Sequence, residues 1–439
     1  MSRLTKEEIN KNPEKIYTNF INIYTDAITK YDAIQLYTFK SMLNNVKEYD
    51  GFYKRWKNSI SKIRKLQKDI EQKQVDGYVI SNQLETISNR MAQSDYLLHM
   101  IPSNLVVSLI TNFDQFLSNM LTYLFQHING QINVIEESVK YNELCDCNDT
   151  CSIQDFYIEK FTDSFFRKSH NEQFEWLDKK LSLNIKTQMQ NYDDFIFLCE
   201  LRNSIIHNDS KPSNFFFKTV NIDKYKKYGF NIEKNKRIVF NPNNITFLFY
   251  TVHLSTTYLF SILGQKYYLK DEKMIEYIES AINDNIVDKL KISPQLAVIL
   301  LKNQLSNYLK HTSDYSYIYK INLCIAYKKL NKLEKVKDIL KSMDWTNCSD
   351  KFIYAKYVLL DDKENIIKYM QKFIEPDWRL YYQVWPLFDN LRNEDYFKIE
   401  YQKIFNEEFV YNPVNLKVTP KDIQKVEKEL KKKNKKEEV

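Results

Sequence analysis

The residues best suited to chemistry lie together near the middle of the chain, namely Arg202, Asn203 and His207. They belong to a segment with helical periodicity, residues 192–208. Histidine is the side chain whose proton affinity best suits proton transfer near neutral pH. A guanidinium holds a phosphate or another oxyanion through two parallel hydrogen bonds. Together these groups are typical of a site that moves a proton and stabilises negative charge.

A helical projection of this segment gives the arginine an unusual position. At about 100° per residue, Arg202 lies in the middle of the apolar arc, and Asn203 and His207 flank that arc one turn apart. The arc consists of Phe195, Leu198, Cys199, Leu201, Ile205 and Ile206. Because a buried cation without a partner is costly, the pattern predicts that a ligand or a second subunit meets Arg202. The alternative is a structural arginine bound to an acid such as Asp114, with His207 satisfied at the edge of the core.

The run from Arg202 to His207 resembles the Rx4–6H signature of HEPN domains, in the form of an arginine, a polar residue, three further residues and a histidine. The surroundings are similar as well. HEPN domains are helical bundles that begin with a long amphipathic helix, here expected from Ile101. They place the signature late and close with a further helix, here residues 245–268. The resemblance covers roughly residues 96–270.

This resemblance implies a ribonuclease that needs neither a metal nor a cofactor. The 2′-OH of RNA attacks the adjacent phosphorus once it is deprotonated. In the implied roles, His207 is the acid/base, Arg202 stabilises the charge on the phosphorane, and Asn203 orients His207 or the phosphate. The expected products are a 2′,3′-cyclic phosphate and a 5′-OH, and family members commonly act as homodimers. Two alternatives are an inactive HEPN adaptor or sensor that binds RNA or a protein, and an accidental motif.

A basic segment follows the motif, and it predicts RNA binding. Residues 211–244 carry eight basic and two acidic side chains, together with several aromatic ones. Lysines interleaved with aromatic rings suit single-stranded RNA, and we expect Lys224, Lys226, Lys227 and Tyr228 to contact it. The alternative is a solvated charged face, with residues 215–217 anchoring the segment. The runs 215–220 and 237–240 are candidates for a small hairpin.

Other potential sites carry less information. Cys145, Cys147 and Cys151 lie close in sequence, but their spacing is not typical of zinc ligands, so reduced loop thiols are the favoured interpretation. His253 lies on an apolar helix. It is expected to be a hydrogen-bonded core histidine, unless the packing of that helix brings it to the motif.

The organisation of the chain favours an all-α protein. Its 439 residues include only 5 Gly and 9 Pro, and neither GxGxxG nor GxxxxGK[ST] occurs. Gly51 and Gly77 are expected to break an N-terminal coiled-coil-like region. Shorter helices are expected near 152–168 and 171–186. Asn243 or Asn244 is expected to cap helix 245–268.

Five residues starting at Tyr327 recur at an offset of thirty, which predicts helical hairpins of the tetratricopeptide kind. The expected domains are an N-terminal helical region (1–95), a HEPN nuclease domain (96–270), a helical-repeat-like domain (271–413) and a Lys/Glu-rich tail (414–439).

The cellular setting is inferred from weaker features. The first twenty residues carry seven charges, and the six cysteines are unevenly spaced, which favours a cytoplasmic protein. Residues 245–263 are uncharged but contain seven polar side chains, so a buried bundle helix is favoured over a membrane span. By analogy with similar architectures we expect a toxin or phage-defence effector, with an antitoxin, sensor or trigger protein at the C-terminal helical region.

Overall fold

The computed structural model describes residues 13–70, 77–140, 143, 150–306, 313–346, 348–375 and 377–411, and throughout these residues helices are the only regular elements. The fold is all-α, which confirms the expected class. The described residues form two compact units that divide near residue 285, inside helix α11 (Glu272–Ile292). The division therefore lies about one helix beyond the expected boundary at residue 270.

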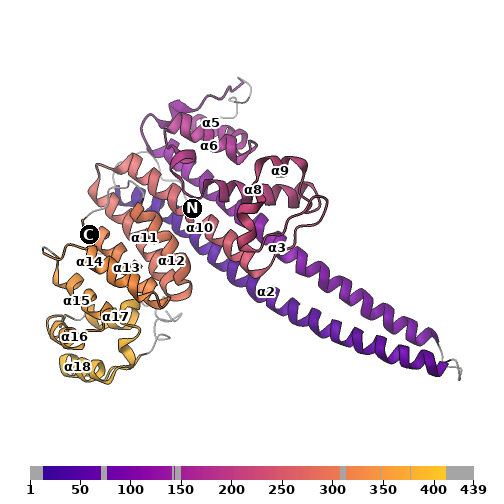
Figure 1. The fold of residues 1–439 in the computed structure, drawn as a ribbon. Coiled ribbons are helices and arrows are strands. Elements are labelled where there is room, and N and C mark those ends of the chain that lie inside the picture. Colours follow the sequence, from indigo (N-terminus) through magenta and orange to yellow (C-terminus); the bar gives the residue numbers. More distant parts are fainter. Residues whose placement is uncertain are drawn as a thin grey trace, which may run out of the picture. The chain divides into compact units, whose positions relative to one another are not determined.

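The first unit contains a long antiparallel pair of helices, α2 (Pro13–Ile70) and α3 (Gly77–His127), which lie side by side (Figure 1). The expected break at Gly51 is wrong, because α2 continues through this residue; one glycine inside a helix costs only about 1 kcal/mol. Helix α3 begins at Gly77 rather than at Ile101 and crosses the expected boundary at residues 95 and 96. Its apolar pattern is continuous only where it enters the bundle, from about Leu105 onward.

Helix α10 (Pro242–Tyr268) forms the centre of this bundle. Its N-cap is Asn241, not Asn243 or Asn244, because Pro242 supplies the first helical residue. Asn244 completes a capping box, since its side chain accepts from the Asn241 N–H at 2.8 Å. Phe260 of α10 stacks on Tyr24 of α2, with ring centroids 4.2 Å apart.

The polar side chains of α10 have partners on α2 and within the helix. Tyr24 Oη lies 3.2 Å from Thr257 Oγ1, and Tyr31 Oη lies 3.0 Å from Thr256 Oγ1. Two helical stretches of the described residues, Glu85–His127 and Asn243–Tyr268, are long and apolar enough to span a bilayer. Most of the second is buried inside the bundle, so tertiary hydrogen bonds account for its mixture of apolar and polar residues.

Shorter helices complete the first unit. They are η1 (Gln131–Val134), α5 (Thr150–Phe166), α6 (His170–Leu181), α7 (Ile185–Gln188), α8 (Tyr192–His207), α9 (Asn214–Thr219) and η2 (Ile222–Tyr228). The stretch expected as one helix near 171–186 is divided, because Ser182 and Asn184 adopt left-handed backbone conformations. The expected hairpin is wrong: residues 214–219 form α9, which Ser213 caps, while residues 237–240 have no regular structure.

The second unit continues with helical hairpins. After the last residues of α11 come α12 (Pro294–Ser306), α13 (Ser313–Lys329), α14 (Leu333–Ser342), α15 (Asp350–Leu359), α16 (Lys363–Met370), α17 (Asp377–Val384), η3 (Pro386–Phe388), η4 (Leu391–Asn393) and α18 (Asp395–Phe405). The thirty-residue repeat has a structural counterpart in the turns of α13–α14 and α15–α16. Asn331 and Asp361 have φ angles of 55° and 56°. The next N–H in each turn donates to the carbonyl of Tyr327 or Tyr357, at 2.9 and 3.1 Å.

Candidate active site

Helix α8, which carries the motif, is buried on two sides over its first half. Phe195 packs on Phe113 of α3, with centroids 4.3 Å apart. Phe197 points to the other side and stacks on Tyr225 of η2 at 3.9 Å. The single apolar arc drawn from the sequence is therefore wrong, because α8 lies between α3 and the residues of α10 and η2, which cover opposite faces. The last turn is open to solvent, with Ile206 43% exposed.

The three motif residues lie within the last six residues of α8, Arg202–His207. Arg202 and Asn203 are half-buried and His207 is exposed. Arg202 Nη1 donates to Asn203 Oδ1 at 3.3 Å. Within the described part of the chain, Arg202 Nε is buried without an acceptor. A buried donor left in this state costs about 1–3 kcal/mol, so the guanidinium is a site where an added anion would be stabilised.

Asn203 connects Arg202 to the preceding turn of α8. Burial raises the pKa of Glu200, while hydrogen bonding from Asn203 and the charge of His170 oppose that change. The Asn203 amide thus has Arg202 on its oxygen and Glu200 on its nitrogen. Asn203 therefore orients the guanidinium in this structure, whereas the sequence suggested His207 or the phosphate as its target.

The acid suggested as a structural partner of Arg202 is occupied elsewhere. Asp114 Oδ1 lies 2.8 Å from His170 Nε2. His170, the first residue of α6, also contacts the buried thiol of Cys199 on α8. Burial lowers the pKa of His170, but the interactions with Cys199 and Asp114 outweigh burial and raise this pKa to about 10. The cluster joins α3, α6 and α8 one turn before Arg202, and the sequence analysis did not identify it.

Two cations beside His207 were also missed. Asp209 follows the end of α8 and pairs with Arg237 at 2.6 Å and with Lys211 at 3.3 Å. The Ile238 N–H donates to Ser210 O at 2.9 Å, so the backbone of residues 237–240 lies against this turn. Both cations belong to the basic segment counted in the sequence, but nothing in their local spacing distinguishes them from the other lysines.

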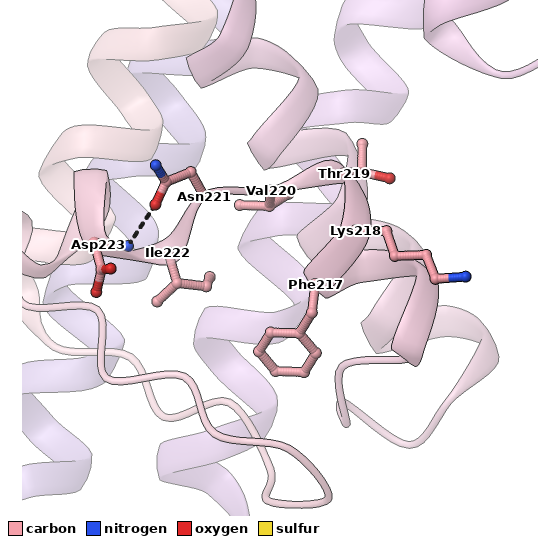
Figure 2. A pocket seen from close by; sticks show the side chains of 7 residues that line it. All are labelled: Phe217, Lys218, Thr219, Val220, Asn221, Ile222 and Asp223. Carbon is pink, nitrogen blue, oxygen red and sulfur yellow. Dashed lines mark hydrogen bonds between the residues drawn. The ribbon is translucent and has the colours of Figure 1, made fainter.

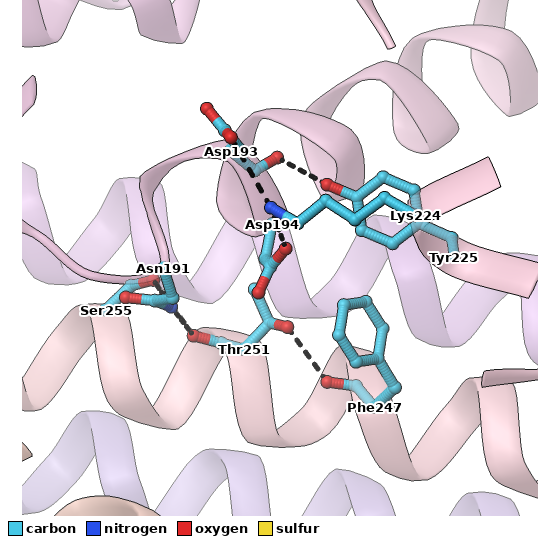
Figure 3. Close-up of polar contacts among 8 residues, drawn as sticks. All are labelled: Asn191, Asp193, Asp194, Lys224, Tyr225, Phe247, Thr251 and Ser255. Carbon is cyan, nitrogen blue, oxygen red and sulfur yellow. Dashed lines mark hydrogen bonds and ion pairs between the residues drawn. The ribbon is translucent and has the colours of Figure 1, made fainter. Parts of the chain in front are cut away.

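Lys224, the first of the residues expected to bind RNA, lies beside Asp193 and Asp194 at the start of α8 (Figure 3). Lys224 pairs with Asp193 at 3.4 Å and with Asp194 at 3.0 Å, in the first turn. At about 1.5 Å per residue, this turn is about 20 Å from His207 along the helix axis. The structure therefore does not bring Lys224 to the motif.

The three neighbours expected to act with Lys224 also have local partners. Lys226 pairs with Asp223 at 2.7 Å. Lys227 Nζ lies 4.9 Å from the ring centroid of Tyr228, and that ring stacks on Phe247 at 4.1 Å. Tyr228 is therefore half-buried against α10, and its ring is less available to a base than the sequence suggested.

A surface hollow of 480 Å³ between α9 and η2 also lies apart from the motif. It is lined by the consecutive residues 217–223, whose charged side chains are Lys218 and Asp223 (Figure 2). None of Arg202, Asn203 and His207 lines it.

His253 and the cysteines do not add to the motif. His253 is fully buried in α10, and its Nε2 lies 3.4 Å from Asp32 Oδ1 of α2, so it is a core histidine. Cys145, Cys147 and the side chain of Cys151 lie outside the described residues. Among the side chains that are described, no group of three or more His, Cys, Asp or Glu residues is arranged to hold a metal ion.

Comparison of the chain with protein-family models, curated proteins and solved structures finds no match. What this site can do chemically is therefore inferred from its own side chains alone. An exposed imidazole is available for proton transfer, a guanidinium has a free buried donor, and an amide holds that guanidinium in place. Two further cations pair with Asp209 on the adjoining turn.

Proposed function

We propose that this protein is a metal-independent endoribonuclease of the HEPN type. The observation that carries the proposal is the C-terminal end of α8, where an exposed histidine follows, five residues on, an arginine whose buried Nε has no acceptor among the described residues. A proton-transfer group next to a prepared anion site suits attack of a 2′-OH on its own phosphodiester. This reaction needs a base, an acid and stabilisation of the pentacovalent intermediate, but no bound metal.

In this proposal His207 exchanges protons with the reacting oxygens. Its exposure lets an RNA chain approach without a preformed pocket. Arg202 stabilises the negative charge that develops on the phosphorane oxygens. Asn203 is a positioning residue, since its Oδ1 accepts from Arg202 Nη1 and restricts the guanidinium. The products are a 2′,3′-cyclic phosphate and a 5′-OH.

The same turn supports a homodimer. Ile206 is 43% exposed and lies on α8 beside Arg202. A second copy docked on this turn would cover Ile206 and bring two sets of motif residues together. Light scattering should then give about twice the chain mass of 52.9 kDa. A monomer that cleaves RNA would contradict the dimer and leave the catalytic assignment intact.

The proposed cellular role is that of a toxin or phage-defence effector in the cytoplasm. The second unit consists of helical hairpins and exposes apolar side chains such as Ile374 and Ile399, which are 62% and 54% exposed. An antitoxin, sensor or trigger protein is proposed to bind these hairpins. Expression of the wild-type chain should arrest growth, and expression of His207→Ala should not.

The decisive experiment is incubation of the purified full chain with total RNA in EDTA, followed by analysis of the fragment ends. Fragments with 2′,3′-cyclic phosphate and 5′-OH ends are expected. Cleavage that appears only after magnesium is added would overturn the proposal. Intact RNA that nevertheless binds the protein would favour the second candidate, an inactive adaptor or sensor.

A further inference from the structure

The turn after α8 places two cations around one carboxylate. Asp209 Oδ1 lies 2.6 Å from Arg237 Nη2, and Asp209 Oδ2 lies 3.3 Å from Lys211 Nζ. The side chains of Asp209, Arg237 and Lys211 are 59%, 51% and 47% exposed. The carboxylate therefore occupies, in open solvent, the position that an anion would take between these two cations.

The backbone holds this arrangement independently of the ion pairs. Asp209 and Ser210 have φ angles of 52° and 59°, which turn the chain sharply after α8. The Ser210 N–H donates to Ser204 O at 3.0 Å, and Ser210 O accepts from the Ile238 N–H at 2.9 Å. Arg237 is therefore kept beside the end of α8 by main-chain hydrogen bonds, so removal of the Asp209 charge should leave both cations in place.

The charges of the trio favour an added anion. The pKa of Asp209 is held below its usual range by Arg237 and then by Lys211, so the carboxylate is ionised at neutral pH. Arg237, Lys211 and the Asp209 carboxylate together carry a net charge of +1. Asp209 lies two residues after His207 in the sequence. Tyr96 of α3, 62% exposed, lies close enough to Arg237 to help raise the pKa of its guanidinium, after the larger effect of Asp209.

We propose that Arg237 and Lys211 bind a phosphate of single-stranded RNA next to the phosphate that is cleaved, and that Asp209 occupies this subsite until RNA displaces it. The inference rests on the proposed ribonuclease function and names the substrate-binding residues of the same site. A carboxylate and a phosphate offer a guanidinium the same pair of acceptor oxygens. Release of counterions favours the polyanion over the single carboxylate.

The exposed ring of Tyr96, near Arg237, favours a single strand as the ligand. Single-stranded RNA is held by cations along its backbone and by aromatic side chains on which unpaired bases stack. Tyr96 is exposed enough to receive a base while Arg237 and Lys211 hold a phosphate. In contrast, Tyr228 at the other end of α8 already stacks on Phe247.

The test uses the full chain with His207→Ala, which prevents cleavage, and measures binding of a labelled single-stranded RNA of mixed sequence between roughly 50 and 200 mM salt. Adding Asp209→Asn should tighten binding by about threefold and steepen the log–log salt slope by about 0.7, the value of one phosphate contact on a single strand. Asparagine tolerates the left-handed backbone at this position. Adding Arg237→Gln instead should weaken binding and flatten the slope by a similar amount.

The matched control is Asp193→Asn, the same substitution at the carboxylate that pairs with Lys224. It should change RNA affinity by less than half as much as Asp209→Asn. Cleavage of RNA by the wild type with unchanged affinity in both the Asp209 and Arg237 variants would overturn the subsite and leave the ribonuclease standing. Weaker binding in Asp209→Asn would also overturn it. RNA that neither binds nor is cleaved would overturn the subsite and the proposed function together.

Discussion

At its N-terminal end α8 holds one lysine between two aspartates, whereas at its C-terminal end one aspartate lies between a lysine and an arginine. Lys224 pairs with Asp193 and Asp194 in the first cluster. Asp209 pairs with Lys211 and Arg237 in the second. The first cluster is net negative beside the positive end of the helix dipole, and the second is net positive beside the negative end.

The number of positive charges in a segment of the sequence therefore does not locate an anion-binding site. Residues 211–244 supply the cations of both clusters. Near the start of α8, Lys224 is neutralised by the acids of the first turn and Lys226 by Asp223, while Lys211 and Arg237 leave a net positive charge around Asp209, just beyond the end of the helix. We therefore expect chemistry at one end of α8 and mainly packing at the other.

The largest difference between the two ends should appear in catalysis. His207→Ala and Arg202→Ala should each lower the rate of RNA cleavage by about 10²–10⁴-fold, the usual contribution of acid/base or charge-stabilising groups. Arg202→Lys should also lose most activity, because lysine lacks the planar fork. Fragment analysis and circular dichroism measure activity and fold. Lys227→Ala at the other end is the control and should retain activity, and full activity in His207→Ala would sink the enzymatic assignment.

For stability we expect the opposite order, with a larger loss from a substitution in the first half of α8 than from one in its last turn. Phe197 is fully buried and stacks on Tyr225, so Phe197→Ala should lower the free energy of unfolding by about 3–5 kcal/mol. Ile206 is 43% exposed, so Ile206→Ala should cost less than about 1 kcal/mol. Urea unfolding monitored by circular dichroism gives both values. Equal losses would show that the last turn of α8 is packed as tightly as its first half.

The cluster around His170, between the two ends, should make stability depend on pH. The pKa of His170 is raised to about 10, above its unfolded value of about 6.5. The folded state therefore binds the extra proton between these values, and His170 stabilises the fold below pH 6.5 and loses this effect as pH rises toward 10.

The slope attributable to His170 is about 1.4 kcal/mol per pH unit in that interval. The groups facing its ring are Asp114 from α3 and Cys199 and Glu200 from α8. Thermal unfolding of the wild type and of His170→Asn across this range isolates the contribution. A stability difference that stays constant with pH would show that the histidine is neutral in the folded protein.

The smallest effect is expected from the lysines of η2. Because Lys224 and Lys226 already have acidic partners, changing Lys224, Lys226 and Lys227 to Ala together should flatten the salt slope of RNA binding by less than one unit in a His207→Ala background. The double variant Lys211→Ala and Arg237→Ala should flatten it more. If the triple variant loses more, the η2 surface is the main RNA contact. If neither variant changes the slope, the Lys-rich tail is the remaining candidate.

The sequence by itself determined the all-α class, the helix that carries the motif and the thirty-residue repeat. These three predictions depend only on residues close together in the sequence: the scarcity of glycine, the helical periodicity and the residues that end each hairpin. It also placed Arg202, Asn203 and His207 near the end of one helix, with Asn203 and His207 one turn apart, since residues four apart in a helix are neighbours whatever the fold. The predicted location of the N-cap of α10 was off by a few residues for an equally local reason, the proline at its first position.

Only the tertiary structure decided which of these groups are free. The partner of Asp114 is His170 rather than Arg202, and the partner of Lys224 is the first turn of α8. Arg237, thirty residues after His207 in sequence, pairs with Asp209 just beyond the end of α8, where a main-chain hydrogen bond joins residues 210 and 238. Long-range pairings of this kind depend on how helices pack, and helical periodicity carries no information about which face meets which neighbour.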